Sequence, residues 1–369
     1  MLSASEQMSV PPLVAAIASA ASVTAIYARR KKSRGKKDLF QSVSDYCDGL
    51  VDEGVIPFIS LRIERFGKTI YSHDYGTFNT PLATGAKFDA DTIARFFSMT
   101  KPITSAAVLV LLEQCDHFSL DEPVSKYIPE WDDSRIKVLV GDNSAVNDVA
   151  ELKTEPANRP ITTRDLLTHS SGISYGFWKD EVSPTSRFMV AAGLELPCPI
   201  AEDERRTNRS GDDYPANLEE FCTRLQDVPL VAHPGTEFHY SCATDVLGRL
   251  VECLDPQRRS LDQFFADTFF TPLGMTDTAF SVGDDKLSRL APCFYVPEAQ
   301  RSSSDAEEED SPALTSPTGK TCNFKLASYY HLGEVSRESP WHSNTSSAFE
   351  VCAHGILSCQ HRIATCVLF

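Results

Sequence analysis

FSMTKPIT, residues 97–104, is the stretch that decides how the rest of this chain is interpreted. It runs into SAAVLVLLEQ, which is apolar nearly all round and predicts a helix buried in a large core from Ser98 onward. Residues three apart share one helix face, so the Lys101 amine can reach the Ser98 hydroxyl. The free N–H groups at a helix N-terminus favour an alkoxide. This S-x-x-K element indicates a nucleophilic serine; the alternative is a capping serine followed by a solvated lysine.

Outward from this stretch, the chain alternates between helical and strand patterns. Apolar residues recur at helical spacing from Leu39 to Leu50, and Gly54 supplies a stop. FISLRIERFGKTIYSHDYG, residues 58–76, has two alternating runs around Phe66-Gly67-Lys68, the pattern of a β-hairpin. A further helix is expected to begin with Thr162 or Thr163 as its N-cap, and another is expected over residues 242–253. A mixed α/β (α+β) fold follows.

Charge excludes one class of partner. The formal net charge is −16, although residues 29–37 form a basic block, so the body after it is strongly acidic. Nucleic-acid binding needs clustered Lys and Arg along a surface. We expect no nucleic-acid partner and a small-molecule substrate instead.

The cysteines argue against a metal centre. There are eleven of them, without a C-x-x-C arrangement or recurring spacing. This pattern favours reduced, buried thiols in a reducing compartment over a disulfide framework or a zinc site.

The N-terminal residues 1–37 differ in kind from the rest. Residues 10–27 (VPPLVAAIASAASVTAIY) carry no charge, and the basic flank follows at once. This favours a membrane anchor with the body on the cytoplasmic side, although the run is short for a span. An organelle-targeting segment and a disordered leader remain as alternatives. We leave residues 1–37 out of the fold.

Three blocks resemble a known family. FSMTKPIT, ITTRDLLTHSSG at 161–172 and TPLGMTDT at 271–278 are similar to blocks of the serine β-lactamase-like group, which includes class C β-lactamases, D-Ala-D-Ala carboxypeptidases and related esterases. The blocks occur in the family's order, and the resemblance runs from about residue 38 to about residue 360. It implies one domain over residues 38–369, with an antiparallel sheet flanked by helices and a helical subdomain.

The family's second motif, Tyr-x-Asn, matches Tyr240-Ser241-Cys242. The resemblance implies that Tyr240 acts as a general base or proton relay towards Ser98; an ordinary half-buried tyrosine is the alternative. Cys242 occupies the substrate-binding position where many members have asparagine. A thiol replaces an amide poorly as donor and acceptor, so the departure favours ester hydrolysis over β-lactam or peptide processing.

The family's third motif, on a late strand, has no match. Residues 349–358 (FEVCAHGILS) resemble the stretch that precedes that strand, and residues 301–320 are acidic and Ser/Pro-rich, typical of a disordered insertion. We therefore expect a domain that is truncated at its C-terminal end. His169 and His233 are expected to be structural, with His169 paired locally to Asp165.

These observations predict a serine hydrolase that acts by acyl transfer on a small ester or amide. Ser98 attacks the carbonyl, Lys101 and Tyr240 accept and return its proton, and no metal or organic cofactor is needed. The alternative is a catalytically weak or inactive relative that serves as a scaffold, or a truncated gene product.

Overall fold

The computed structural model describes residues 40–80, 82–143, 146, 151–176, 184–194 and 215–292, together with residues 294–295, 318, 325–326 and 352–354. The chain divides into two units, residues 1–47 and 48–369, and only residues 40–47 of the first are described. The expected first helix is present as α3 (Gln41–Asp52), and it is followed by Gly54 with a left-handed backbone (φ 70°).

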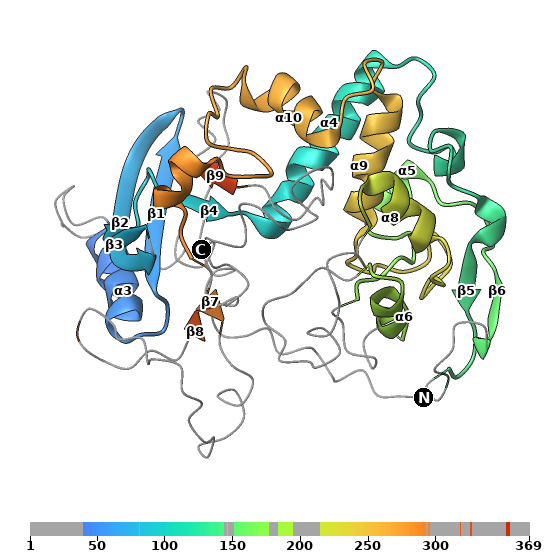
Figure 1. Ribbon diagram of the computed structural model, residues 1–369, viewed down its shortest axis with the longest axis horizontal. Helices are drawn as coiled ribbons and strands as arrows, with labels where there is room; N and C mark the ends of the chain where they lie inside the picture. Colours follow the sequence, from blue (N-terminus) through green and yellow to red (C-terminus); the bar gives the residue numbers. More distant parts are fainter. Residues whose placement is uncertain are drawn as a thin grey trace, which may run out of the picture. The chain divides into compact units, whose positions relative to one another are not determined.

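The expected hairpin is confirmed. Strand β1 (Phe58–Arg65) pairs antiparallel with β2 (Lys68–Thr80), and β3 (Ala83–Lys87) adds to β2, which gives the sheet order β1-β2-β3 (Figure 1). The loop is Phe66-Gly67, because Lys68 already pairs with Arg65. Both loop residues have positive φ (51° and 70°), the backbone that two-residue hairpin turns require.

The remaining strands form two-stranded antiparallel ladders: β4 (Ile93–Arg95) with β9 (Cys352–His354), β5 (Lys137–Leu139) with β6 (Thr154–Pro156), and β7 (Phe294–Tyr295) with β8 (Lys325–Leu326). Every strand pair in the described ranges is antiparallel. With the helices this confirms the mixed α/β fold with antiparallel sheets.

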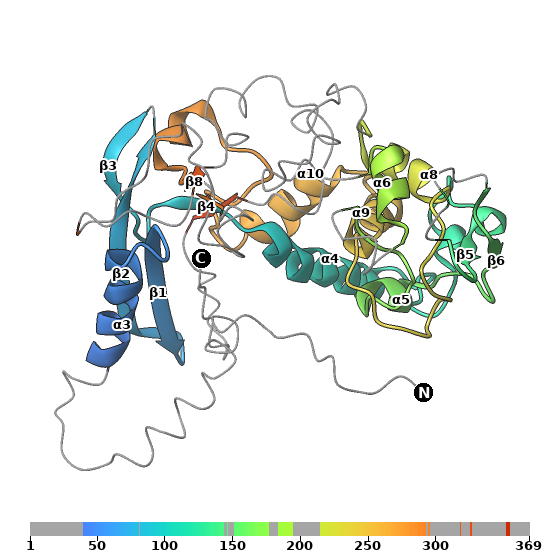
Figure 2. The ribbon, with the colours of Figure 1, turned by 90° about the horizontal axis from the view of Figure 1, so that it is seen from below.

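Helices supply most of the core. Among the described residues, the α-helices after α3 are α4 (Thr100–Gln114), α5 (Thr163–Leu167), α6 (Ser186–Ala191), α8 (Leu218–Leu225), α9 (Ala243–Leu254) and α10 (Leu261–Phe265). A π-helical turn (Ala266–Phe270) continues α10, and 3-10 turns lie at Phe97–Met99 (η2), Val124–Lys126, Asp133–Arg135 and Asp284–Arg289. Helices α4 and α9 pack side by side (Figure 2).

Helix α4 is buried on one face, not all round as its composition predicts. Thr104, Ala107, Val108 and Leu111 are at most 1% exposed and recur at helical spacing, whereas Leu109 is 49% exposed. The apolar run therefore contributes a stripe to the core and leaves its other face outside.

Helix α5 begins as the sequence predicts, with Thr162 as its cap. The Asp165 backbone N–H bonds to the Thr162 hydroxyl, and the Thr162 N–H donates to the Asp165 carboxylate over 2.9 Å, a capping box. Two guanidinium N–H groups of Arg159 bind the same carboxylate at 2.6 and 2.8 Å. These contacts fix the start of the segment that leads to His169.

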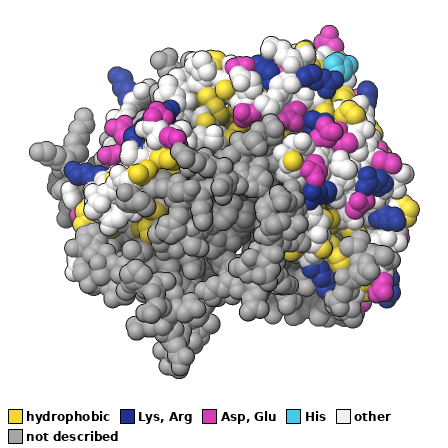
Figure 3. Space-filling view, viewed as in Figure 1, with side chains coloured by type: hydrophobic (Ala, Val, Ile, Leu, Met, Phe, Trp, Pro, Cys, Tyr) yellow, Lys and Arg dark blue, Asp and Glu magenta, His cyan; other side chains and the backbone are white. Residues whose placement is uncertain are grey.

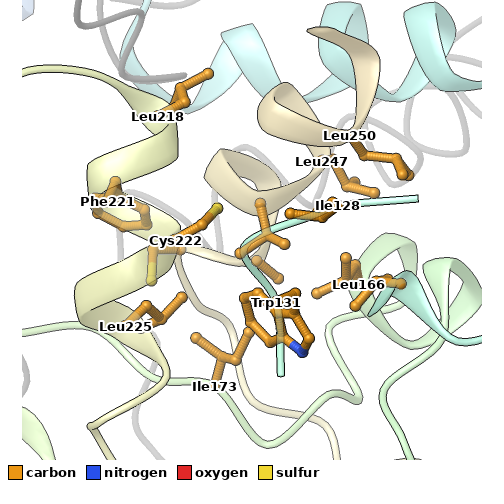
Figure 4. Close-up of a cluster of buried hydrophobic side chains, with 14 of the residues drawn as sticks. Ile128, Trp131, Leu166, Ile173, Leu218, Phe221, Cys222, Leu225, Leu247 and Leu250 are labelled. Carbon is orange, nitrogen blue, oxygen red and sulfur yellow. The ribbon is translucent and has the colours of Figure 1, made fainter. Parts of the chain in front are cut away.

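The main core lies where helices α8 and α9 pack against neighbouring turns (Figure 4). Its buried side chains include Ile128, Trp131, Leu166, Ile173, Leu218, Phe221, Cys222, Leu225, Leu247 and Leu250. Each fully buried side chain of this size contributes about 1.5–3 kcal/mol through removal from water. The core anchors α9 firmly, and the residues just before α9 carry Tyr240.

A second apolar cluster lies at the three-stranded sheet. Phe58 and Phe88 stack with ring centroids 4.0 Å apart, and Phe78, Ala94 and Ala291 complete the cluster. Because Ala94 lies on β4, this cluster fixes the strand that leads into the Ser98 turn.

The membrane assignment made from residues 10–27 is corrected. No helix in the described ranges is both long and apolar enough to cross a bilayer, and residues 10–27 lie outside those ranges. The run is also short of the about 20 apolar residues that a span needs. Neither the anchor nor the targeting interpretation is retained. Nearly all of the 301–320 insertion also lies outside the described residues.

Candidate active site

Ser98 lies on the 3-10 turn η2, between strand β4 and helix α4. The sequence places it at the head of the helix, but α4 begins two residues later at Thr100. The Met99 N–H donates to the Phe96 carbonyl over 2.9 Å and closes the turn. Phe97 adopts φ 44°, a left-handed conformation that is uncommon for a bulky residue. This tight turn presents the Ser98 hydroxyl.

Lys101, in the first turn of α4, reaches the serine as the S-x-x-K spacing predicts. Its Nζ lies 3.4 Å from Ser98 Oγ, and the residue is only 8% exposed. The ammonium also lies over two aromatic rings, 4.9 Å from the Tyr240 centroid and 5.5 Å from the Tyr175 centroid. Cation–π attraction to these rings compensates part of the cost of burying the charge.

Tyr240 joins the site from the loop that precedes α9. Its hydroxyl donates a hydrogen bond to Ser98 Oγ over 2.6 Å. Two donors, the Tyr240 phenol and the Lys101 ammonium, thus converge on one oxygen. Such an arrangement stabilises negative charge on Ser98 Oγ, and it offers two neighbouring groups through which the proton of the serine hydroxyl can be exchanged.

Cys242 is the last residue before α9 and is 3% exposed. Its thiol donates to the Ser174 carbonyl over 3.2 Å. Burial raises the pKa of the Cys242 thiol well above its usual range, so the group stays protonated as a donor at neutral pH. A role for Cys242 in substrate binding remains a proposal.

The structure gives His169 a different setting from the one expected. The imidazole Nδ1 lies 3.3 Å from both the backbone N and the Oγ of Ser241, and its ring centroid is 4.9 Å from that of Tyr240. Asp165 is held by Arg159 and Thr162, so the local pair with His169 is replaced by these contacts. Burial, with the nearby Lys101 charge, lowers the pKa of His169 to about 4.

His233 occupies a structural position, as expected. Its Nδ1 accepts the Asn158 backbone N–H over 3.2 Å, and its Nε2 lies 3.0 Å from Glu155 Oε1. These contacts tie the loop before Tyr240 to the segment that leads into α5.

Sequence reasoning missed Tyr175, which is 2% exposed and forms the second ring beside Lys101. Its ring centroid is 5.7 Å from that of Tyr240, and burial raises the pKa of its phenol above the usual range. The only sequence signal is its place three residues after Gly172, at the end of the second block.

One face of the molecule carries mixed charge where its residues are described. On the face drawn in Figure 3, Lys and Arg side chains are interspersed with Asp and Glu. Mixed charges of this kind do not form the continuous basic stripe that a nucleic-acid backbone requires on that face.

Comparison with known structures and sequences relates this chain to a family. The fold resembles simvastatin synthase (LovD) from Aspergillus terreus, with a TM-score of 0.60 at 21% identity over 89% of this chain and 67% of that one. The acyltransferase calJ of Penicillium decumbens is 32% identical over 64% of this chain and 46% of its own length. The esterase EstB of Burkholderia gladioli is 30% identical over 59% of this chain and 45% of its own length.

The chain spans about half the length of the curated relatives it matches. A family profile described as Beta-lactamase matches residues 43–344, which is most of the chain. The matched region contains the Ser98 turn, the Lys101 side chain and the Tyr240 loop. The chain therefore belongs to the β-lactamase family.

Proposed function

We propose that this chain is a serine hydrolase that acts by acyl transfer on small esters. The observation that carries the proposal is the convergence of the Tyr240 hydroxyl, at 2.6 Å, and Lys101 Nζ, at 3.4 Å, on Ser98 Oγ. A serine hydroxyl is a weak nucleophile unless a neighbouring group takes its proton, and both neighbours lie within or close to hydrogen-bond reach.

In the proposed reaction, the Lys101–Tyr240 pair first gives up one proton to solvent; Ser98 Oγ then bonds to the ester carbonyl carbon as its own proton passes to that pair. The alkoxide of the substrate leaves as an alcohol when it takes that proton back, which leaves an acyl-Ser98. Water then attacks the acyl carbon, gives its proton to the same pair, and releases the acid and free Ser98. We assign the Ser98 backbone N–H as one donor to the carbonyl oxygen as it becomes charged.

An ester is preferred over a β-lactam or a peptide because of Cys242. The Cys242 thiol donates to the Ser174 carbonyl. At the position of Cys242, the family's Tyr-x-Asn motif has an amide, which can both donate and accept hydrogen bonds. A site without that amide has less means to hold the polar groups beside an amide bond. The similarity to a protein named esterase EstB supports the same choice.

A second candidate function differs only in the molecule that accepts the acyl group from Ser98. The relative named acyltransferase calJ favours transfer of the acyl group from Ser98 to an alcohol instead of to water. Both reactions share the acyl-enzyme, so the same residues serve each of them.

Turnover of short-chain nitrophenyl esters beside a chromogenic cephalosporin tests the proposal. We expect ester hydrolysis that Ser98→Ala abolishes, with cephalosporin cleavage at least about tenfold slower. Added butanol that diverts product to a butyl ester identifies the transferase. Ester turnover that persists in Ser98→Ala, or a preference for the cephalosporin, contradicts the proposal.

A further inference from the structure

His169 binds the main chain on both sides of Tyr240. Its carbonyl oxygen accepts the His239 N–H over 2.7 Å, and its imidazole Nδ1 accepts the Ser241 N–H over 3.3 Å. The residues immediately before and after Tyr240 are thus both tied to one residue of another loop.

These contacts define the state of the imidazole. A backbone N–H only donates, so Nδ1 must present its lone pair to Ser241, which leaves the proton on Nε2 of a neutral ring. Ser241 Oγ lies 3.3 Å from the same nitrogen and itself accepts the Ala243 N–H over 3.3 Å. Because burial and Lys101 hold the pKa of His169 to about 4, the acceptor persists at neutral pH.

The ring also packs against the tyrosine. The His169 and Tyr240 centroids are 4.9 Å apart with the rings tilted at 41°, and Phe238 meets the imidazole edge-on at 6.0 Å. The backbone of His169 is left-handed, with φ 52°, which is uncommon for a residue other than glycine. Glycine would fit this backbone without strain but would supply neither the nitrogen acceptor nor the ring.

We propose that His169 is a positioning residue for Tyr240: it holds the phenol at hydrogen-bond distance from Ser98 without itself touching the reacting atoms. The inference rests on the proposed function, in which Tyr240 exchanges a proton with Ser98. A proton relay depends on placement, since a shift of about 1 Å in a reacting group can cost about 10²-fold in rate. Nδ1 of His169 accepts the Ser241 N–H and Nε2 carries the ring proton, so neither nitrogen offers a free lone pair with which to act as the base.

A double-mutant cycle tests this role. His169→Gly keeps the left-handed backbone and its carbonyl while it removes the ring; His169→Asn places an amide oxygen where Nδ1 lies. We expect His169→Gly to lower kcat for a nitrophenyl ester about 10²-fold with KM within about threefold, and His169→Asn to recover at least about tenfold. In a Tyr240→Phe background, His169→Gly should cost less than about threefold, because its partner is already disabled.

His233→Asn is the matched control: it changes another partly buried histidine that accepts a backbone N–H, one whose ring contacts Asn158 and Glu155, and it should leave kcat within about twofold. Equal losses from His169→Gly in both Tyr240 backgrounds indicate general damage to the fold and overturn the proposal. The proposal is also overturned if His169→Gly keeps the kcat of the wild type while Tyr240→Phe is impaired. If Tyr240→Phe itself is fully active, the proposed function fails instead.

A measurement on the wild-type protein covers the case in which the glycine variant does not fold. Nitrogen-15 NMR of labelled histidines should show His169 as the neutral Nε2–H tautomer at pH 6. A protonated Nδ1 at that pH is incompatible with the Ser241 contact and overturns the inference.

Discussion

The Tyr240 hydroxyl donates to Ser98 Oγ over 2.6 Å although the two residues lie 142 positions apart in the sequence. The contact joins the loop before α9 to the turn before α4, and those two helices pack side by side. A hydrogen bond this short between two hydroxyls lies at the strong end of its class. The helix pair therefore serves as the frame that sets the distance between relay and nucleophile.

Removal of the Tyr240 hydroxyl should disable the relay and spare the fold. Tyr240→Phe retains the ring over Lys101 but loses the donor to Ser98. We expect kcat for a nitrophenyl ester to fall about 10²–10⁴-fold, the usual contribution of a general acid–base group, with little change in the melting temperature. Tyr75→Phe, which loses a hydroxyl bond to Asp52 instead, is the control and should keep full activity.

Removal of the Lys101 charge should affect both the reaction and a neighbour. Lys101→Met should reduce ester turnover about 10²–10⁴-fold. Because the Lys101 charge is one cause of the low pKa of His169, that pKa should rise above about 4 in the variant while burial keeps it below 6.5. NMR titration of His169 measures the change, and Lys126→Met, at an exposed lysine beside Glu122, should leave it unmoved.

Stability should fall in acid because of His169. The pKa of His169 is about 4 in the folded protein and 6.5 when unperturbed, so between these values the unfolded chain binds a proton that the folded chain does not. The free energy of unfolding should therefore decrease as the pH falls from 6.5 to 4, by at most about 1.4 kcal/mol per pH unit. The titratable groups that face the imidazole are Lys101 and Tyr240; its other neighbours, Ser241 and Phe238, carry no charge.

Urea denaturation of wild type and His169→Asn at several pH values isolates this contribution, since all other titrating groups are shared. The wild type should lose more stability than His169→Asn across this window. Parallel pH profiles for the two proteins would show that His169 titrates normally.

Gly172 should resist substitution more than other left-handed glycines. Its φ is 81°, and a Cβ there would lie 2.0 Å from the Ala232 carbonyl oxygen, a backbone atom that has no side-chain freedom to move away. Gly85, with φ 65° and open space around it, is the matched control. Gly172→Ala should lower the free energy of unfolding by at least about 2 kcal/mol more than Gly85→Ala. Similar losses at both sites would mean that the loop shifts freely.

Local contacts of the site were predictable from sequence. The S-x-x-K spacing places Lys101 near Ser98 because neighbours in one helical turn meet whatever the rest of the chain does, and the Thr162 cap is equally local. Tyr240 was found through the resemblance to a family, since nothing local links it to Ser98. The alternation of helical and strand patterns predicted the mixed α/β fold, and the same resemblance supplied its antiparallel sheet flanked by helices.

The missed features depend on tertiary packing. The left-handed backbone of His169 and its bond to Ser241 join two loops, and the ring of Tyr175 reaches Lys101 only after the loop beyond α5 folds back. Helix α6 lies within a largely polar stretch of sequence for which no helix was expected, yet Phe188 and Met189 are at most 2% exposed. Its short length leaves too little periodicity to be recognised.

The central claim, that Ser98 is the activated nucleophile, is tested most directly by intact-protein and peptide mass spectrometry after brief exposure to a fluorophosphonate, which phosphonylates such a serine with loss of fluoride. We predict one adduct per chain, mapped to the peptide that contains Ser98, with none in Ser98→Ala and slowed labelling in Tyr240→Phe. Labelling of Ser98→Ala at the wild-type rate, or an adduct at any other residue, would contradict the account.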